Sequence, residues 1–177
     1  MKIAVFCASS TPYKKAYCDA ATILGTMIAR QGDILYYGGS NLGTMGLISG
    51  AALEAGGHVV GVIPTFFSQE IINSQPVTEL VKVSSLAERK EYMIRECDAF
   101  IALPGGVGTL DEILEVMIAK QLKLIDKPIV LFNSDGFYDN FLSQIDDMGA
   151  NGFFRSGKRP DMRIATTIED VLLFCRQ

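Results

Sequence analysis

Along the chain, short apolar runs alternate with longer segments in which apolar residues recur every three or four positions. Short runs rich in Val, Ile, Phe and Tyr are typical of buried strands, and the longer periodic segments are typical of helices. The pattern predicts strands at residues 2–8, 34–37, 58–63, 80–83, 99–103 and 129–133. It predicts helices at residues 13–30, 47–55, 85–97, 110–121, 138–148 and 167–175. This alternation predicts an α/β fold with a doubly wound parallel sheet, formed by residues 1–177 as a single domain.

The stretch from Ala99 to Gln121 has the most specific pattern. Its charge-free apolar run ends at Pro104-Gly-Gly-Val-Gly-Thr109, and a helical pattern follows. Gly105, Gly106 and Gly108 indicate a loop, because closely spaced glycines suit neither a strand nor the interior of a helix. Glycines let the backbone approach a ligand closely, and the free amides of a helix N-terminus favour an anion. The stretch therefore predicts a phosphate-binding turn that ends at the threonine.

The same turn allows a second interpretation. Thr109-Leu-Asp-Glu112 also has the pattern of a capping box, with Thr109 at the N-cap and Glu112 three residues further on. In that case these side chains only stabilise the helix. A bound phosphate would be repelled by the carboxylates of Asp111 and Glu112, so phosphate binding requires cations from another part of the chain.

Suitable cations lie in the preceding predicted helix, residues 85–97. Arg89 and Lys90 fall on the same stripe of that helix as Leu86 and Met93, which is its apolar face. A cation on an apolar face needs an anion as its partner. The partner is either a carboxylate of the protein, which gives an internal ion pair, or the phosphate of a ligand.

Two further segments follow predicted strands and are candidates for ligand contact. Ser9 and Ser10 follow the first strand, where open α/β sheets bind ligands, although their hydroxyls also suit helix capping. Residues 38–46 follow the second strand and contain four glycines, among them Gly39 and Gly43. This loop is either a second phosphate or ribose site or simply a turn.

Composition narrows the classes of function. Apolar residues make up 49% of the 177 residues, which excludes a disordered chain, and a net charge of −4 argues against a nucleic-acid partner. No apolar run is long enough to span a membrane, and the four cysteines are scattered. We therefore expect a cytoplasmic protein with reduced thiols and no membrane partner. His58 is the single histidine, so no multi-histidine metal site is possible, no metal is expected, and His58 is expected to be structural.

Three motifs resemble those of one family. Pro104-Gly-Gly-Val-Gly-Thr109 with Glu112 resembles the Pro-Gly-Gly-x-Gly-Thr-x-x-Glu signature of the LOG (Lonely Guy) family, the cytokinin riboside 5'-monophosphate phosphoribohydrolases long mislabelled lysine decarboxylases. Residues 38–46 resemble the glycine-rich string that precedes Met-Gly in that family. Arg89 and Lys90 resemble its Met-x-x-Arg-Lys element, and the distance from this arginine to the signature glutamate matches, since 112 − 89 = 23.

The resemblance covers nearly the whole chain. It implies a Rossmann-like fold, at least a homodimer with the active site completed near the interface, and hydrolysis of a purine nucleoside 5'-monophosphate to free base and ribose 5-phosphate. The substrate is AMP or a cytokinin riboside monophosphate, and no cofactor is expected. Val116 and Ala119 widen the apolar surface of the central helix, as an interface helix requires.

Roles for individual residues follow from the motifs and the resemblance together. Arg89 is expected to orient the phosphate, and Glu112 to stabilise positive charge at C1' or to activate water. Glu70 matches a substrate-contacting glutamate of the family if one residue is deleted here. The expected substrate-binding residues are Ser9, Gly39, Gly43, Glu70, Lys90, Gly105, Gly106, Gly108 and Thr109.

Two other classes of function remain open at this stage. A protein of the same fold can bind or sense a nucleotide without turnover. The old lysine decarboxylase label would require pyridoxal phosphate held by a Schiff-base lysine. Neither glycine-rich loop contains a lysine, which argues against the second class.

Overall fold

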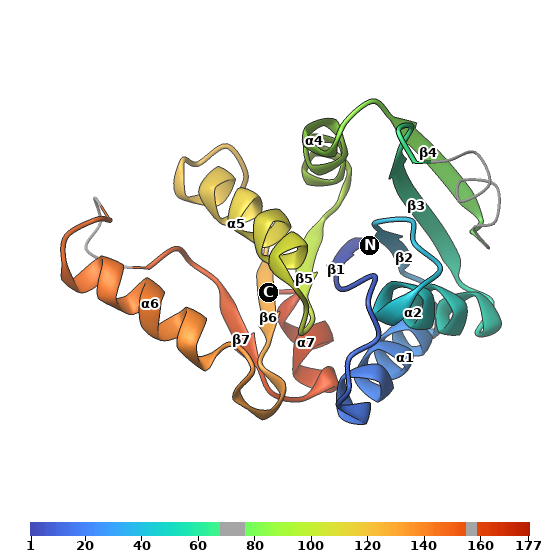
Figure 1. Cartoon of the computed structure of the whole chain (residues 1–177), viewed down its shortest axis with the longest axis horizontal. Helices are drawn as coiled ribbons and strands as arrows, with labels where there is room; N and C mark the ends of the chain where they lie inside the picture. Colours follow the sequence, from blue (N-terminus) through green and yellow to red (C-terminus); the bar gives the residue numbers. More distant parts are fainter. Residues whose placement is uncertain (68–76, 155–158) are drawn as a thin grey trace.

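In the computed structural model, which describes residues 1–67, 77–154 and 159–177, seven parallel strands form one sheet (Figure 1). Their order is β4-β3-β2-β1-β5-β6-β7. The strands are β1 (Lys2–Phe6), β2 (Ile34–Tyr37), β3 (His58–Pro64), β4 (Glu79–Val83), β5 (Ala99–Ala102), β6 (Ile129–Phe132) and β7 (Arg163–Ala165). The helices are α1 (Lys15–Arg30), α2 (Gly43–Glu54), α4 (Leu86–Glu96), α5 (Val107–Gln121), the 3-10 turn η1 (Ser134–Gly136), α6 (Asp139–Ala150) and α7 (Ile168–Phe174). None of the helices in the described ranges is long and apolar enough to cross a membrane.

Helices cover both faces of the sheet, because its central strands are apolar on both sides. In β1, Ile3 and Val5 belong to the core built with α1, α2 and α7, whereas Ala4 and Phe6 belong to the core built with α4, α5 and α6. Figure 1 shows these two groups of helices on opposite sides of the strands. A parallel strand buried on both faces has apolar residues at successive positions, which explains the uninterrupted apolar runs in the sequence.

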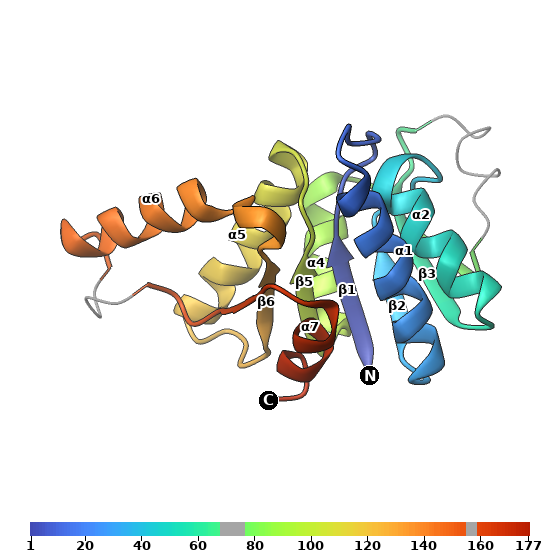
Figure 2. The ribbon, with the colours of Figure 1, turned by 90° about the horizontal axis from the view of Figure 1, so that it is seen from below.

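The strand order reverses at β1, which pairs with β2 on one side and with β5 on the other. Ile3 lies opposite Leu35 of β2 and opposite Ala99 of β5. Open α/β sheets have a crevice at such a reversal, beyond the carboxyl ends of the strands. Figure 2 shows that the loop after β1 and the first turns of α2 and α5 gather at the end toward which β1 points.

All six predicted strands are confirmed, and their ends agree to within two residues. Strand β7 was not predicted, because Arg163–Ala165 is a short segment that includes a charged residue. Helices α2 and α5 begin at Gly43 and Val107, earlier than the predicted starts at 47 and 110. Both helices therefore begin inside the glycine-rich segments that the sequence pattern assigned to loops.

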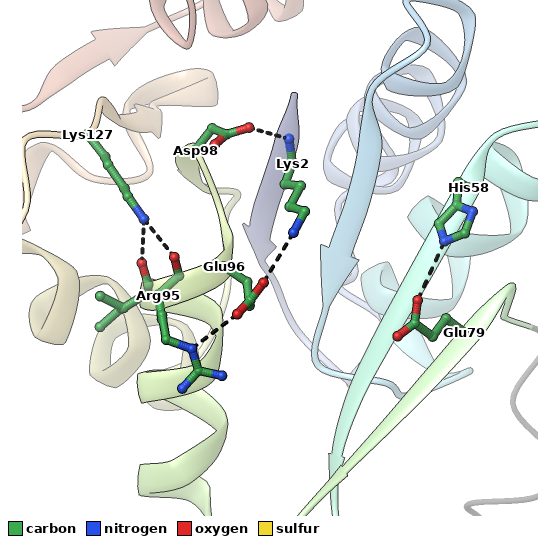
Figure 3. Close-up of polar contacts among 8 residues, drawn as sticks. Lys2, His58, Glu79, Arg95, Glu96, Asp98 and Lys127 are labelled. Atoms are coloured by element: carbon green, nitrogen blue, oxygen red, sulfur yellow. Dashed lines mark hydrogen bonds and ion pairs between the residues drawn. The ribbon is translucent and has the colours of Figure 1, made fainter.

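Polar contacts lie at the amino ends of the strands, which is the end of the sheet opposite to the crevice (Figure 3). His58 Nε2 at the start of β3 lies 3.9 Å from Glu79 Oε2 at the start of β4. Lys2 Nζ at the start of β1 lies 3.1 Å from Glu96 Oε2 at the end of α4. His58 thus joins neighbouring strands far from the crevice, as expected of a structural residue.

The expectation that Val116 and Ala119 widen the outer surface of α5 is wrong. Both side chains are buried within the chain, because α5 packs closely on the sheet. Toward its C-terminal end, α5 instead exposes Ile118, and Leu122 follows one helical turn later.

Candidate active site

A cavity of about 560 Å³ opens at the reversal point of the sheet. Its walls come from the ends of strands, the loops after them and the first turns of α2, α4 and α5. The described lining residues are Cys7, Ala8, Ser9, Ser10, Gly38, Ser40, Asn41, Leu42, Met45, Ile63, Phe67, Leu86, Arg89, Gly106, Val107, Gly108, Thr109 and Glu112.

Six of the residues expected from the sequence line this cavity, and the others do not. Those in the lining are Ser9, Arg89, Gly106, Gly108, Thr109 and Glu112. Those absent from the described lining are Gly39, Gly43, Lys90 and Gly105. Glu70 lies outside the described residues.

Arg89 and Glu112 form an ion pair across the cavity wall. Nη2 of Arg89 on α4 donates a hydrogen bond to Oε1 of Glu112 on α5. The side chains are 12% and 3% exposed, so the pair is largely removed from water. The internal ion pair expected as one alternative for Arg89 is therefore present, and it lies in the cavity rather than away from it. A buried pair of this kind persists only if both charges stay compensated.

The environment of Glu112 changes its protonation. Burial raises the pKa of Glu112 to about 7, and the neighbouring Arg89 guanidinium opposes that rise. A carboxyl group with a pKa near the working pH is suited to proton transfer or to stabilising positive charge. Arg89 and Glu112 therefore form a charged, titratable centre inside the cavity.

Two buried polar atoms near this centre have no hydrogen-bond partner among the described residues. They are Nε of Arg89 and Oγ1 of Thr109. Buried polar groups are nearly always hydrogen-bonded, and an unpaired one calls for an explanation. Both residues line the cavity, but the two atoms are themselves shielded from it, so they can pair with oxygen acceptors of a ligand only after their side chains shift.

The capping-box interpretation of Thr109 and Glu112 is wrong. Helix α5 begins at Val107, its N-cap is Gly106, and no side chain caps it. Thr109 therefore lies within the first turn and Glu112 within the second, where Glu112 is turned inward and buried. The first-turn amides of α5 have no carbonyl in a preceding turn to bind, so they are available to an anion in the cavity.

Gly105 shapes this turn without lining the cavity. A Cβ at Gly105 would overlap the side chain of Thr109. A glycine is therefore needed at this position, because the turn passes close to the start of α5. The direct contact of Gly105 with substrate stays a prediction, and the structure adds a packing role for this glycine.

The loop after β1 is fixed to α2 by Thr44. Thr44 Oγ1 accepts a hydrogen bond from the amide of Ala8 at 2.9 Å and donates one to the carbonyl of Ala8 at 3.1 Å. This leaves Ser9 and Ser10 in the cavity lining. The expectation that these serines cap α1 is wrong, because the N-cap of α1 is Lys14.

Gly39 and Gly43 give the second glycine-rich loop its path. Both have positive φ angles, 80° and 59°, which glycine adopts without strain. A Cβ at Gly43 would also collide with the backbone of Ser9 and Ser10. These two glycines therefore bring α2 against the loop after β1, and neither lines the cavity.

Lys90 faces away from the cavity lining. Its Nζ lies 2.9 Å from Asp111 Oδ1 and 2.9 Å from Glu115 Oε2, both on α5. Its side chain is only 13% exposed. The cation expected to help bind the phosphate is thus occupied by two carboxylates of the protein.

Sequence reasoning missed the apolar part of the cavity. Met45, Ile63, Phe67, Leu86 and Val107 supply it. No composition signal separates these residues from core residues. Only their positions at or just after the carboxyl ends of strands, or in the first turns of helices, distinguish them from the core.

The comparisons with known proteins agree with this geometry. A family model described as "Possible lysine decarboxylase" matches residues 45–173. The chain is 45% identical over 172 residues to the cytokinin riboside 5'-monophosphate phosphoribohydrolase LOG of Oryza sativa subsp. japonica, covering 97% of this chain and 71% of the relative. It is 44% identical over 158 residues to LOG5 of Arabidopsis thaliana, covering 89% of this chain and 69% of that relative.

Solved structures show the same fold. The X-ray structure of TM1055 is 26% identical and has a TM-score of 0.76, with 99% of this chain and 98% of that chain covered. A Moco carrier protein from Chlamydomonas reinhardtii has a TM-score of 0.72 at 24% identity, covering 97% of this chain and 93% of that chain, which is a likeness of fold alone. With its Rossmann-like sheet and its close sequence relatives, the chain belongs to the LOG family.

Proposed function

We propose that this protein hydrolyses the N-glycosidic bond of a purine nucleoside 5'-monophosphate, such as AMP or a cytokinin riboside monophosphate. The products are the free base and ribose 5-phosphate. The observation that carries the proposal is the buried Arg89–Glu112 pair, which lies in a cavity beside the free N-terminus of α5. The plant relatives are named for this activity, which supports the same reaction here.

Binding begins at the phosphate. The first-turn amides of α5 and the unpaired hydroxyl of Thr109 donate hydrogen bonds to phosphate oxygens. The guanidinium of Arg89 lies in the same cavity and compensates the negative charge. Gly106 and Gly108 have no side chain to separate the backbone from the phosphate. Ser9 on the opposite wall contacts the ribose or the phosphate through its hydroxyl.

Bond cleavage uses the carboxylate of Glu112. As the bond from C1' to the base nitrogen breaks, its electron pair leaves with the base, and C1' takes on oxocarbenium character. Ionised Glu112 stabilises that positive charge and accepts a proton from the water whose oxygen bonds to C1'. The departing base nitrogen takes up a proton from solvent water, which gives the neutral free base. The phosphate draws Arg89 toward itself, which leaves the carboxylate of Glu112 free to face the sugar.

The apolar wall of the cavity is the proposed site for the base. Met45, Ile63 and Leu86 offer apolar surface in the same cavity as the charged pair. A planar purine, with or without an apolar substituent on N6, is compatible with such a wall. A nucleotide thus meets the cavity with its phosphate at α5 and its base against these side chains.

We propose a homodimer that uses the outer side of α5. Ile118, Leu122 and Leu124 are each more than half exposed. Large exposed apolar side chains close together favour an interface between protein molecules. Because α5 also carries Glu112, an interface on this helix would lie near the active site. A reducing compartment, the cytoplasm, is proposed from the four free cysteines.

The test is a panel of nucleoside monophosphates incubated with the purified protein, with chromatographic detection of free base. We expect release of adenine or an N6-substituted adenine together with ribose 5-phosphate. Binding of a nucleotide without release of base would assign the protein to the non-catalytic class. An absorbance spectrum with the bands of pyridoxal phosphate would instead revive the decarboxylase class.

A further inference from the structure

Helix α4, which carries Arg89, packs on the core through Met93 and, less deeply, through Tyr92 and Ile94. Met93 is the single buried residue among its eleven residues, all of which are described. The facing helix α5 buries six. Polar contacts therefore add to a small apolar contact in fixing α4, and the placement of Arg89 depends on the position of α4.

The end of α4 remote from the cavity is held by lysines (Figure 3). Lys127 Nζ donates hydrogen bonds to the carbonyls of Ile94 and Arg95 at 2.8 and 3.0 Å. Lys2 Nζ binds Glu96 Oε2 at 3.1 Å. These contacts join the C-terminus of α4 to β1 and to the segment before β6, and they leave the other end of the helix to be fixed separately.

At the end nearer the cavity, Lys90 makes the corresponding contacts. Its ammonium bridges Asp111 and Glu115, which are four residues apart on α5 and therefore on one side of that helix. Adjacent residues of a helix point about 100° apart. The neighbour of Lys90 therefore points to a different side, and there Arg89 meets Glu112.

We propose that Lys90 is a positioning residue: by bridging Asp111 and Glu115 it fixes α4 against α5 so that Arg89 is held opposite Glu112, and it does not bind the substrate phosphate. The expected effect of Lys90 variants on turnover rests on the proposed hydrolysis. The structural part of the proposal, the placement of Arg89 by Lys90, is independent of that function. The burial of Lys90, its two carboxylate partners and its absence from the described cavity lining all support the proposal.

The first test removes the lysine that bridges the two helices. Misplacement of a reacting group by about 1 Å lowers turnover as much as a hundredfold, so Lys90→Met should reduce kcat by about ten- to a hundredfold. The dissociation constant for ribose 5-phosphate, measured by calorimetry, should rise as well, because Arg89, which compensates the phosphate charge, is displaced. Lys90→Arg, which can still bridge two carboxylates, should recover most of the lost turnover. Lys15→Met is the matched control, because Lys15 has a similar carboxylate partner, Asp19, on the exposed face of α1.

The second test removes the partners of Lys90 instead. If Lys90 only positions α4, the double variant Asp111→Asn/Glu115→Gln should lose turnover as Lys90→Met does. If Lys90 binds phosphate, the double variant should bind ribose 5-phosphate as tightly as the parent or more tightly, with turnover preserved. Parental turnover together with parental ribose 5-phosphate affinity in the double variant would overturn the proposal.

A third measurement does not require turnover. The charge of Asp111 raises the pKa of Glu112, and Arg89 lowers it. Removal of the acidic charges alone should therefore lower the pKa of Glu112, whereas displacement of Arg89 should raise it. We expect carboxyl NMR titration of the double variant to show a rise, and a fall would overturn the proposal. A parent protein that releases no base from any monophosphate would contradict the proposed function without affecting this result.

Discussion

Arg89 on α4 and Glu112 on α5 face each other as a hydrogen-bonded ion pair, although they lie 23 positions apart in the chain. The pair lies in the wall of the cavity, so each member has a protein partner before any ligand arrives. A bound phosphate competes with Glu112 for the guanidinium. In the proposed reaction, substrate binding and release of the Glu112 carboxylate are therefore coupled through one arginine.

The first prediction concerns Arg89 itself. Arg89→Ala should lose most of the activity, because the phosphate loses its cation and the buried carboxylate of Glu112 loses its partner. Arg89→Lys should also be poor, because an ammonium cannot reproduce the forked contacts of a guanidinium. Turnover of AMP measures both variants. Arg95→Ala, on the same helix but outside the described cavity lining, is the control and should keep parental activity. Near-normal turnover by Arg89→Ala would refute the role.

The second prediction concerns the charge of Glu112. Glu112→Gln keeps the size of the side chain and removes its negative charge, so hydrolysis should be at least about a hundredfold slower. Binding of ribose 5-phosphate should persist, because the amides of α5 and Thr109 are unchanged. One turnover assay and one calorimetric titration on the same preparation are sufficient. A variant that hydrolyses the nucleotide at the parental rate would exclude the carboxylate from the chemistry.

The third prediction is a pH dependence. Glu112 must be ionised to stabilise positive charge, and its pKa is raised to about 7 by burial. Below that pH the ionised fraction falls, so kcat/KM should decrease about tenfold per pH unit on the acid side and level off above about pH 7. The second ionisation of a phosphate lies lower, near pH 6, and should add a separate bend. A profile that is flat between pH 5.5 and 8 would contradict the assignment.

The fourth prediction concerns the phosphate of the substrate. AMP should be cleaved far faster than adenosine, because binding energy at a remote phosphate raises turnover as well as affinity. The comparison requires kcat and KM for both compounds. Equal cleavage of the two would mean that the first turn of α5 and Arg89 do not hold a phosphate.

The fifth prediction concerns packing between α1 and α2. A Cβ at Gly25 of α1 would overlap the backbone carbonyl of Ile48 in α2, so Gly25→Ala should destabilise the fold by about 1–3 kcal/mol. Gly50→Ala on α2 is the matched control, since a Cβ there meets open space. Because alanine is the better helix former, Gly50→Ala should be neutral or stabilising by about 0.5–1 kcal/mol. Thermal melts of the two variants should shift in opposite directions or by clearly different amounts.

Much of the fold was predictable because parallel strands buried on both faces leave an unmistakable apolar run in the sequence. Strand β7 shows the limit of that signal. Arg163–Ala165 pairs at the edge of the sheet beside β6, where one charged residue is tolerated and a long apolar run is unnecessary. Its pairing depends on tertiary contact, which local sequence does not encode.

The site was predictable in its charged members and less so in its details. The need for cations near the carboxylates of Asp111 and Glu112 pointed to Arg89, and the structure pairs Arg89 with Glu112. The sequence alone could not show which of Arg89 and Lys90 lies in the cavity, because it does not reveal which side of α4 faces the cavity. Thr109 and Glu112 also fitted a capping box by spacing alone, and only the actual start of α5 at Val107 excludes it.

The described residues that line the cavity all lie between Cys7 and Glu112. The segments from β6 to the C-terminus, including α6 and α7, complete the sheet and both of its cores without contributing to that lining. The first two thirds of the chain therefore supply the described ligand-binding residues, and the last third completes the sheet and cores that hold them in place. A chimaera that takes its last third from a relative should keep the substrate preference of this protein, while its thermal stability follows the donor.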